Sequence, residues 1–325
     1  MTPFLTAVER HHALRWGLSL ARWNTTDDGV SAAAVKATYL SRVSVIIVVA
    51  VWMVSVLPVA TIELSAQPAD STRLIDEIHN YHGGTAVWWT GHNGWLIKSG
   101  DLLVGTDLVL EYQGRIDPSP VSALELAEDL DISFITHGHG DHFGRETTRI
   151  LIKHSKCLFV IPESTLDIAH ELGIPEERLI VARPREAFEV MGIRVEPIRA
   201  IHGNANFAVY YEANLLDCGY LITINGRRFF QPGDSVLLED HLFLESVDVH
   251  FVSPTEHNTY IEPSVILINA ISADYILPQH HGTMRYDERD RFWAKGYPAE
   301  VKLRLSRPLQ DRFFILDPGE RLDIE

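Results

Sequence analysis

From about residue 74 to the C-terminus, short apolar runs alternate with polar turns that contain glycine, asparagine or proline. Runs of roughly four to eight residues that are rich in valine, isoleucine and aromatic side chains are typical of buried β-strands. The pattern predicts strands at 85–89, 95–98, 102–106, 132–136, 187–190, 193–198, 207–211, 220–224, 228–231, 247–252 and 275–278.

Helical patterns lie between some of these strands, at about 146–153, 164–172 and 263–271. Gly173 and Pro175 end the second pattern, since glycine favours the end of a helix and proline cannot continue one. Asn225 and Gly226 form a hairpin signal between two predicted strands. Strands interspersed with helices predict a layered α/β domain, which we place at residues 74–325.

The N-terminal part of the chain has a different character. Residues 43–62 form a run of twenty residues without a charged side chain. That length suits a helix that crosses a bilayer. The basic residues before the run are Arg10, Arg15, Arg22, Lys36 and Arg42, and the acidic residues Glu63 and Asp70 come after it. The positive-inside rule then predicts a cytoplasmic N-terminus and a domain outside the cytoplasm.

A cleaved signal peptide would explain the same apolar run. Leu64, Ser65 and Ala66 resemble a cleavage site, and a start codon assigned too far upstream would account for the long polar extension at 1–42. The domain is therefore expected to be membrane-anchored or exported if 43–62 is a span or a signal. A buried core helix is the remaining alternative, and it would leave the protein in the cytoplasm.

Composition narrows the classes of function. Apolar residues make up 46% of the chain and charged residues 22%, as in ordinary globular proteins. The formal net charge of −16 disfavours nucleic acid as a partner, because affinity for phosphate backbones comes mainly from lysine and arginine. Cys157 and Cys218 are the only cysteines, so no cysteine-rich zinc module is available. We expect two buried thiols, or one disulfide if the domain is exported.

The candidate chemistry is concentrated directly after the predicted strand 132–136. Four side chains of metal-ligand type follow within six residues: His137, His139, Asp141 and His142. Residues two apart in an extended stretch face the same side, so the first two histidines can reach one metal together. The glycines between them let the backbone turn and carry the other two ligands to a second position. Imidazole and carboxylate ligands without thiolate suit zinc, manganese or iron.

This segment matches the HxHxDH motif and resembles the metallo-β-lactamase superfamily over roughly residues 75–285. The resemblance implies a four-layer αββα metallo-β-lactamase fold, here with an N-terminal apolar helix at 43–62, and two divalent metal ions. It also implies three later ligands: His202 for the first metal, Asp234 as the bridge and His280 for the second metal.

Further segments are similar to the branch that includes L-ascorbate-6-phosphate lactonase. They are Gly91-His92 with Trp95-Leu96-Ile97, Gly105-Thr106-Asp107, 172–178, Gly233-Asp234-Ser235 and His280-His281. In this comparison Asp107 supports a histidine ligand by accepting its other N–H. His281 supports the site from outside the ligand set and is the alternative ligand to His280. His92 is expected to be structural or at the rim. The sequence departs from that lactonase at His202, where the lactonase has an acidic residue, and after Met284.

Hydrolysis of a small molecule by a metal-activated hydroxide is the function that these residues indicate. Asp141, His142 and Asp234 are the predicted catalytic residues, and a lactone or an ester is the expected substrate. Phosphodiester or phospholipid hydrolysis is the alternative, for which four arginines could bind the anion: Arg145, Arg227, Arg228 and Arg285. A non-catalytic, membrane-tethered binding module is the alternative of another class, and the seven filled ligand positions disfavour it. Homo-oligomerisation is left open.

Overall fold

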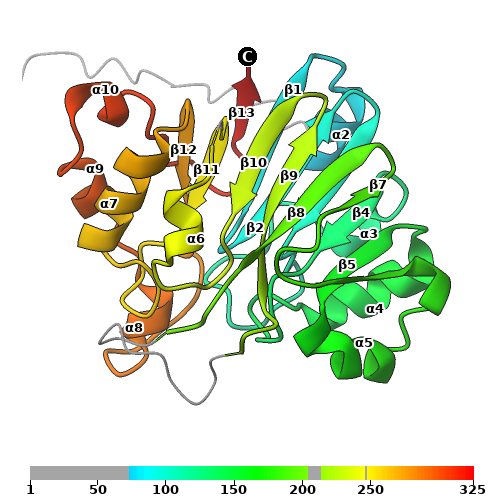
Figure 1. The fold of residues 1–325 in the computed structure, drawn as a ribbon. Coiled ribbons are helices and arrows are strands. Elements are labelled where there is room, and N and C mark those ends of the chain that lie inside the picture. The colour runs from blue at the N-terminus through cyan, green and yellow to red at the C-terminus, as the bar shows by residue number, and fades with distance from the viewer. Residues whose placement is uncertain (1–72, 204–213, 246) are drawn as a thin grey trace, which may run out of the picture. The chain divides into compact units, whose positions relative to one another are not determined.

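The computed structural model describes residues 73–203, 214–245 and 247–325. These residues form two β-sheets that face each other, with helices on the outer sides (Figure 1). The apolar helix predicted at 43–62 and the strand predicted at 207–211 lie outside the described residues. Within the described ranges, no helix has the length and apolar character needed to cross a bilayer.

The two sheets are mixed. The first has seven strands in the order β13 (Arg321–Ile324), β1 (Thr85–Gly91), β2 (Gly94–Ser99), β3 (Leu102–Thr106), β4 (Ile132–Phe134), β5 (Leu158–Pro162) and β6 (Leu179–Ala182). The second has six strands in the order β12 (Tyr275–Pro278), β11 (Val249–Val252), β10 (Arg227–Gln231), β9 (Cys218–Ile224), β8 (Ile193–Arg199) and β7 (Phe188–Val190).

Helices pack on the outer face of each sheet. Those on the first sheet are α2 (Leu74–Asn80), α3 (Ala123–Leu126), α4 (Arg145–His154) and α5 (Leu166–Leu172), with the 3₁₀ turns η1 (Glu163–Thr165) and η2 (Glu176–Arg178) near them. Those on the second are α6 (Glu239–Leu242), α7 (Glu262–Ile271), α9 (Pro298–Lys302) and α10 (Arg307–Gln310). The short helix α8 (Arg291–Ala294) belongs to the loops at one end of the strands. The predicted α/β fold with two sheets is confirmed.

Alternation along the strands explains how one sheet serves two apolar layers. In β1, Val87 and Trp89 belong to the cluster between the sheets, whereas Ala86 and Trp88 belong to the cluster under the helices. Successive side chains on a strand point to opposite faces, so a fully apolar strand can fill both layers. Trp88 is 0% exposed, and burial of a large apolar side chain contributes about 1.5–3 kcal/mol.

One buried polar side chain in the second sheet makes stability depend on pH. His250, in β11, is 0% exposed and its ring stacks on Phe230 at a centroid distance of 5.4 Å. Neither ring nitrogen has a hydrogen-bond partner within the described residues. Burial, with a smaller effect of His241, lowers the pKa of His250 from 6.5 to about 3. The neutral ring is therefore the form that the folded chain accepts.

We expect the free energy of unfolding to fall as the pH decreases from about 6.5 towards 3. The unfolded chain binds a proton at His250 that the folded chain does not bind over this range, which costs about 1.4 kcal/mol per pH unit. Urea unfolding of wild type and His250→Phe at several pH values measures the effect. The variant should lose this part of the slope, and parallel curves for the two proteins would contradict the prediction.

Candidate metal centre

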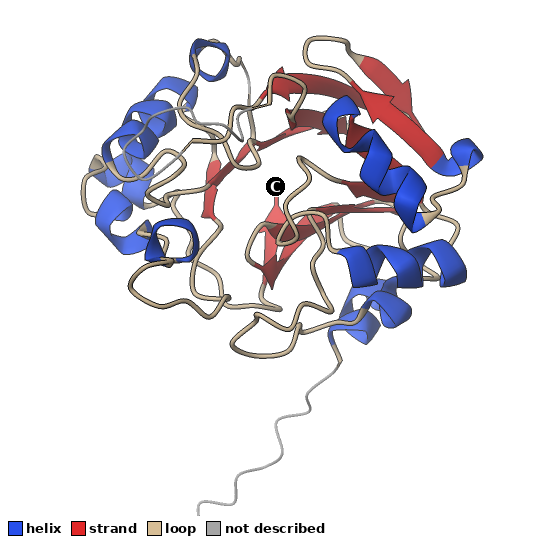
Figure 2. Ribbon diagram, turned by 90° about the horizontal axis from the view of Figure 1, so that it is seen from below, coloured by secondary structure: helices blue, strands red, loops and turns tan. Residues whose placement is uncertain are grey.

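The histidines and carboxylates of the candidate site all follow the carboxyl ends of strands. They come after β3 (Asp107), β4 (His137 to His142), β8 (His202), β10 (Asp234), β11 (His257) and β12 (His280). In the first sheet β3 runs parallel to β4, and in the second β10, β11 and β12 run parallel. Strand β8 has the same direction, because β9 lies antiparallel to both β8 and β10. Parallel strands end at the same edge, so the loops meet at one end of the two sheets, which Figure 2 shows from below.

One group of ligand atoms consists of His137, His139 and His202, whose donor atoms lie within 4.8 Å of one another. Burial lowers the pKa of His137 well below its usual value, which keeps the ring neutral and its lone pair available. The Nε2 atom of His137 is buried and has no hydrogen-bond partner among the described residues. A buried nitrogen of this kind, aimed at two further imidazoles, fits a metal ion.

A second group lies next to the first and contains Asp141, His142 and His280, together with His92. The Nε2 atoms of His142 and His280 are 3.4 Å apart, and Asp141 Oδ2 lies 3.8 Å and 3.9 Å from them. Burial lowers the pKa of His280 to about 3, so this ring is also neutral. His280 itself, not its neighbour His281, provides the nitrogen in this group.

Asp234 lies between the two groups. Its Oδ1 is 3.3 Å from His142 Nε2, and its Oδ2 is 3.5 Å from His202 Nε2 and 3.1 Å from His280 Nε2. Burial would raise the pKa of Asp234, but the electrostatic influence of the surrounding imidazoles, those of His280 and His142 first, lowers it well below its usual value. The carboxylate is therefore ionised and contacts ligand atoms of both groups. The donor set is histidine and aspartate throughout, which suits divalent cations such as zinc.

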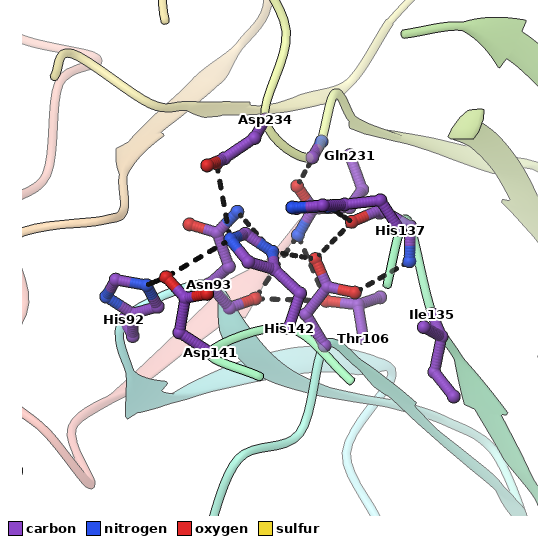
Figure 3. A network of polar contacts seen from close by, with 12 residues as sticks. His92, Asn93, Thr106, Ile135, His137, Asp141, His142, Gln231 and Asp234 are labelled. Atoms are coloured by element: carbon purple, nitrogen blue, oxygen red, sulfur yellow. Dashed lines mark hydrogen bonds and ion pairs between the residues drawn. The ribbon is translucent and has the colours of Figure 1, made fainter. Parts of the chain in front are cut away.

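A single carboxylate, Asp107, organises one histidine of each group. Its Oδ2 accepts from His142 Nδ1 at 2.8 Å. The other ring nitrogen of His142, Nε2, then faces Asp234 (Figure 3). The same oxygen accepts from the hydroxyl of Thr136 at 2.7 Å, and that hydroxyl accepts in turn from His137 Nδ1 at 3.2 Å. Buried carboxylates that fix the tautomer of a histidine ligand are a common feature of metal sites.

Two further histidines contact the carboxylate ligands. His92 Nε2 donates to Asp141 Oδ2 at 3.0 Å (Figure 3). His257 Nε2 is 2.7 Å from Asp234 Oδ2. The sequence analysis expects His92 to be structural or at the rim of the site, and in the structure it is buried against Asp141. His257 was missed by the sequence analysis, although its place after the buried strand β11 is the same signal that marks His280 after β12. His281, predicted to support the site, packs against Trp89 with the ring centroids 4.7 Å apart and belongs to neither group of ligand atoms.

Buried amides below the cluster join the two sheets. Gln279 Oε1 accepts from Trp95 Nε1 at 2.9 Å and from Gln231 Nε2 at 3.0 Å, and Gln279 Nε2 donates to Gln231 Oε1 at 2.6 Å. Trp95 comes from the first sheet and both glutamines come from the second. Because these contacts cross between the sheets, they fix the distance between the strand ends that carry the ligands.

A cavity of about 240 Å³ opens over the cluster. Its described lining residues are Tyr112, His139, Gly140, Asp141, His202, Asp234, His257, Phe292 and Trp293. Ligand residues therefore form its floor, and three aromatic side chains form part of its wall. A small molecule in this cavity would lie directly on the candidate metal ligands.

Comparison with known proteins agrees with this geometry. The model of the β-lactamase superfamily domain matches residues 105–294, more than half of the chain. A UPF0173 metal-dependent hydrolase of Pelotomaculum thermopropionicum is 25% identical over 250 residues, covering 73% of this chain and 99% of that protein. The structure of Igni18, a metallo hydrolase from Ignicoccus hospitalis, is similar with a TM-score of 0.58 and 15% identity, covering 73% of this chain and 97% of that one.

The isothiocyanate hydrolase from Delia radicum gut bacteria has a similar fold, with a TM-score of 0.56 and 16% identity over 73% of this chain and 98% of that one. Two facing sheets with a histidine–aspartate cluster at their strand ends define a metal-dependent hydrolase of the metallo-β-lactamase fold. The chain belongs to the β-lactamase superfamily, as its HxHxDH motif predicts.

Proposed function

We propose that this protein binds two divalent cations, zinc, manganese or iron, and hydrolyses a lactone or an ester of a small molecule. The observation that carries the proposal is the position of Asp234, whose carboxylate contacts His202 of one ligand group and His142 of the other within 3.5 Å. When bound, a pair of cations would lower the pKa of a water molecule and stabilise negative charge on a substrate oxygen.

Asp141 is the residue that we propose to accept a proton during hydrolysis. Asp141 lines the cavity, and its Oδ2 accepts from His92, which leaves Oδ1 to take the proton of an attacking water. His142 and Asp234 are the other two residues that we propose to be catalytic. Both are buried; Asp234 lines the cavity, and His142 contacts Asp234. Asp107 fixes the ring of His142, so the ligand geometry exists before a substrate enters.

The chemistry of the cavity wall favours a neutral substrate group. Tyr112, Phe292 and Trp293 are aromatic, and none of the described lining residues is a lysine or an arginine. The aromatic side chains can contact an apolar substituent of a lactone or an ester. The carbonyl group of such a substrate is uncharged, so it needs no cationic side chain in the wall. The segments shared with the L-ascorbate-6-phosphate lactonase branch support the same substrate class.

Phosphodiester hydrolysis is the second candidate, and a neighbouring cavity favours it. This cavity of about 540 Å³ shares Tyr112 and Gly140 with the first, and Arg145 and Arg149 line it. An anionic group of a substrate could extend from the metal ligands into this space. Arg149 is paired with Glu146 at 3.3 Å, however, so Arg145 is the cation with greater freedom to bind an anion.

Metal content is the first test of the proposed function. Full-length protein purified without chelator should contain two equivalents of zinc, manganese or iron per chain. In a screen of lactones, esters and phosphodiesters, it should release acid from a lactone or an ester. Turnover of phosphodiesters alone would favour the second candidate. A folded protein that binds no cation after reconstitution would contradict the proposal and favour a non-catalytic binding module.

A further inference from the structure

His257, outside the predicted ligand set, contacts the carboxylate between the two ligand groups. Its Nε2 lies 2.7 Å from Asp234 Oδ2, and the next residue, Asn258, donates from Nδ2 to Asp234 Oδ1 at 2.9 Å. Both side chains are buried, at 1% and 0% exposure. Each oxygen of Asp234 therefore accepts one hydrogen bond from the loop that follows β11.

The short distance agrees with a hydrogen bond in which His257 Nε2 donates to the carboxylate. The donor atoms of His202, Asp234 and His257 are close enough together to hold a cation, so direct binding of a metal by His257 is the alternative to a hydrogen bond. Two ligand atoms at about 2.0–2.1 Å from a tetrahedral zinc lie roughly 3.3 Å apart. The nitrogens of His142, His202 and His280 approach Asp234 at 3.1–3.5 Å, which agrees with that spacing. His257 approaches at 2.7 Å, the length of a hydrogen bond to a charged group.

The opposite side of the same ring is attached to the cavity wall. The main-chain oxygen of Phe292 accepts from His257 Nδ1 at 3.0 Å and from its backbone N–H at 3.3 Å. Phe292 and Trp293 belong to α8 and line the cavity. Glu256, the preceding residue, accepts from the Tyr297 hydroxyl at 2.6 Å and pairs with Arg291 at 3.4 Å. The loop thus joins Asp234 to the segment that forms the aromatic wall.

We propose that His257 is a positioning residue that holds the Asp234 carboxylate in the orientation the metal centre requires and fixes the Phe292–Trp293 wall above it. A carboxylate oxygen can accept this hydrogen bond and still bind a cation, because it has more than one lone pair. Outer contacts of this kind typically change metal affinity or activity by about 10–100-fold. The inference rests on the metal centre of the proposed function.

Two variants at this position separate the roles of the side chain. His257→Phe keeps a planar ring and removes both polar contacts, whereas His257→Gln can place an amide N–H near Asp234 Oδ2. His250→Phe is the matched control, because it makes the same change at a buried histidine of the preceding strand β11, outside the groups of ligand atoms. Circular dichroism and thermal melting establish that each full-length variant is folded.

Zinc affinity, from competition with a chelator, and the absorption spectrum of the cobalt-substituted protein are the measurements. We expect His257→Phe to lose roughly 10–100-fold in zinc affinity and to change the cobalt spectrum, with His257→Gln restoring most of both. The control should bind zinc like wild type.

Zinc binding by His257→Phe equal to wild type would reduce His257 to a packing role. A loss in His257→Gln as large as in His257→Phe would show that a hydrogen bond to Asp234 does not account for the role of His257. Either result overturns the inference while the proposed function stands. A wild-type protein that binds no zinc would overturn both.

Discussion

Replacing Asp234 by asparagine is expected to lower both zinc affinity and turnover by more than about 100-fold, a larger loss than removal of an outer contact produces. Asparagine has nearly the same size, so the change removes the negative charge and leaves the packing intact. Ligand nitrogens of His142, His202 and His280 surround this carboxylate at 3.1–3.5 Å. Without the charge, the two ligand groups lose the anion that they share.

Asp131→Asn is a suitable control for this experiment. Asp131 directly precedes β4 and accepts a hydrogen bond from the backbone N–H of Leu103 at 2.8 Å. Its replacement by asparagine removes one carboxylate charge, as Asp234→Asn does. It belongs to neither group of ligand atoms. Chelator competition and single-substrate kinetics on both variants measure the difference. Wild-type zinc affinity in Asp234→Asn would show that the carboxylate is not shared between cations.

Replacing Asp107 by alanine is expected to affect both the stability and the metal centre. Three donors lose their acceptor: the backbone N–H and hydroxyl of Thr136 and the Nδ1 atom of His142. All three groups are buried, and a buried donor left without a partner costs about 1–3 kcal/mol. The free energy of unfolding should fall by about 3 kcal/mol or more, and zinc affinity by about 10–100-fold.

Urea unfolding and chelator competition on the same samples test this prediction. Asp107→Asn retains one acceptor oxygen, so its losses should be smaller than those of Asp107→Ala in both measurements. If Asp107→Ala lost stability and kept wild-type zinc affinity, the carboxylate would support the loop and not the histidine ligands.

Local sequence predicts the elements that lie within one continuous pattern. The strands predicted at 102–106 and 275–278 coincide with β3 and β12, and the helix predicted at 263–271 begins one residue after the start of α7. The strand predicted at 132–136 ends two residues earlier, because the backbone N–H of Thr136 donates to the side chain of Asp107 and the chain leaves the sheet. An apolar run shows that a strand is present, and a distant side chain decides where it ends.

Strands that depend on distant partners escaped the sequence analysis. The edge strand β13 pairs with β1, so the last residues of the chain complete a sheet that begins more than 200 positions earlier. Its polar residues Arg321 and Asp323 are exposed, and the alternation is too short to identify a strand. Pairing with β1 and the packing of Leu322 and Ile324 against the core between the sheets give this segment its structure.

The sequence by itself determined the superfamily, the layered α/β class and the residue types of the candidate metal site. Periodicity follows from which face of a strand is buried, and the HxHxDH segment places four candidate ligands within six residues. The tertiary structure decided how Asp234 lies between the two ligand groups, and how Asp107 and His257 contact the ligands. The contacts Asp107–His142, Asp234–His257 and Asp234–His280 join residues that are 35, 23 and 46 positions apart in sequence. They arise because parallel strands end at one edge, a fact of pairing that no local pattern contains.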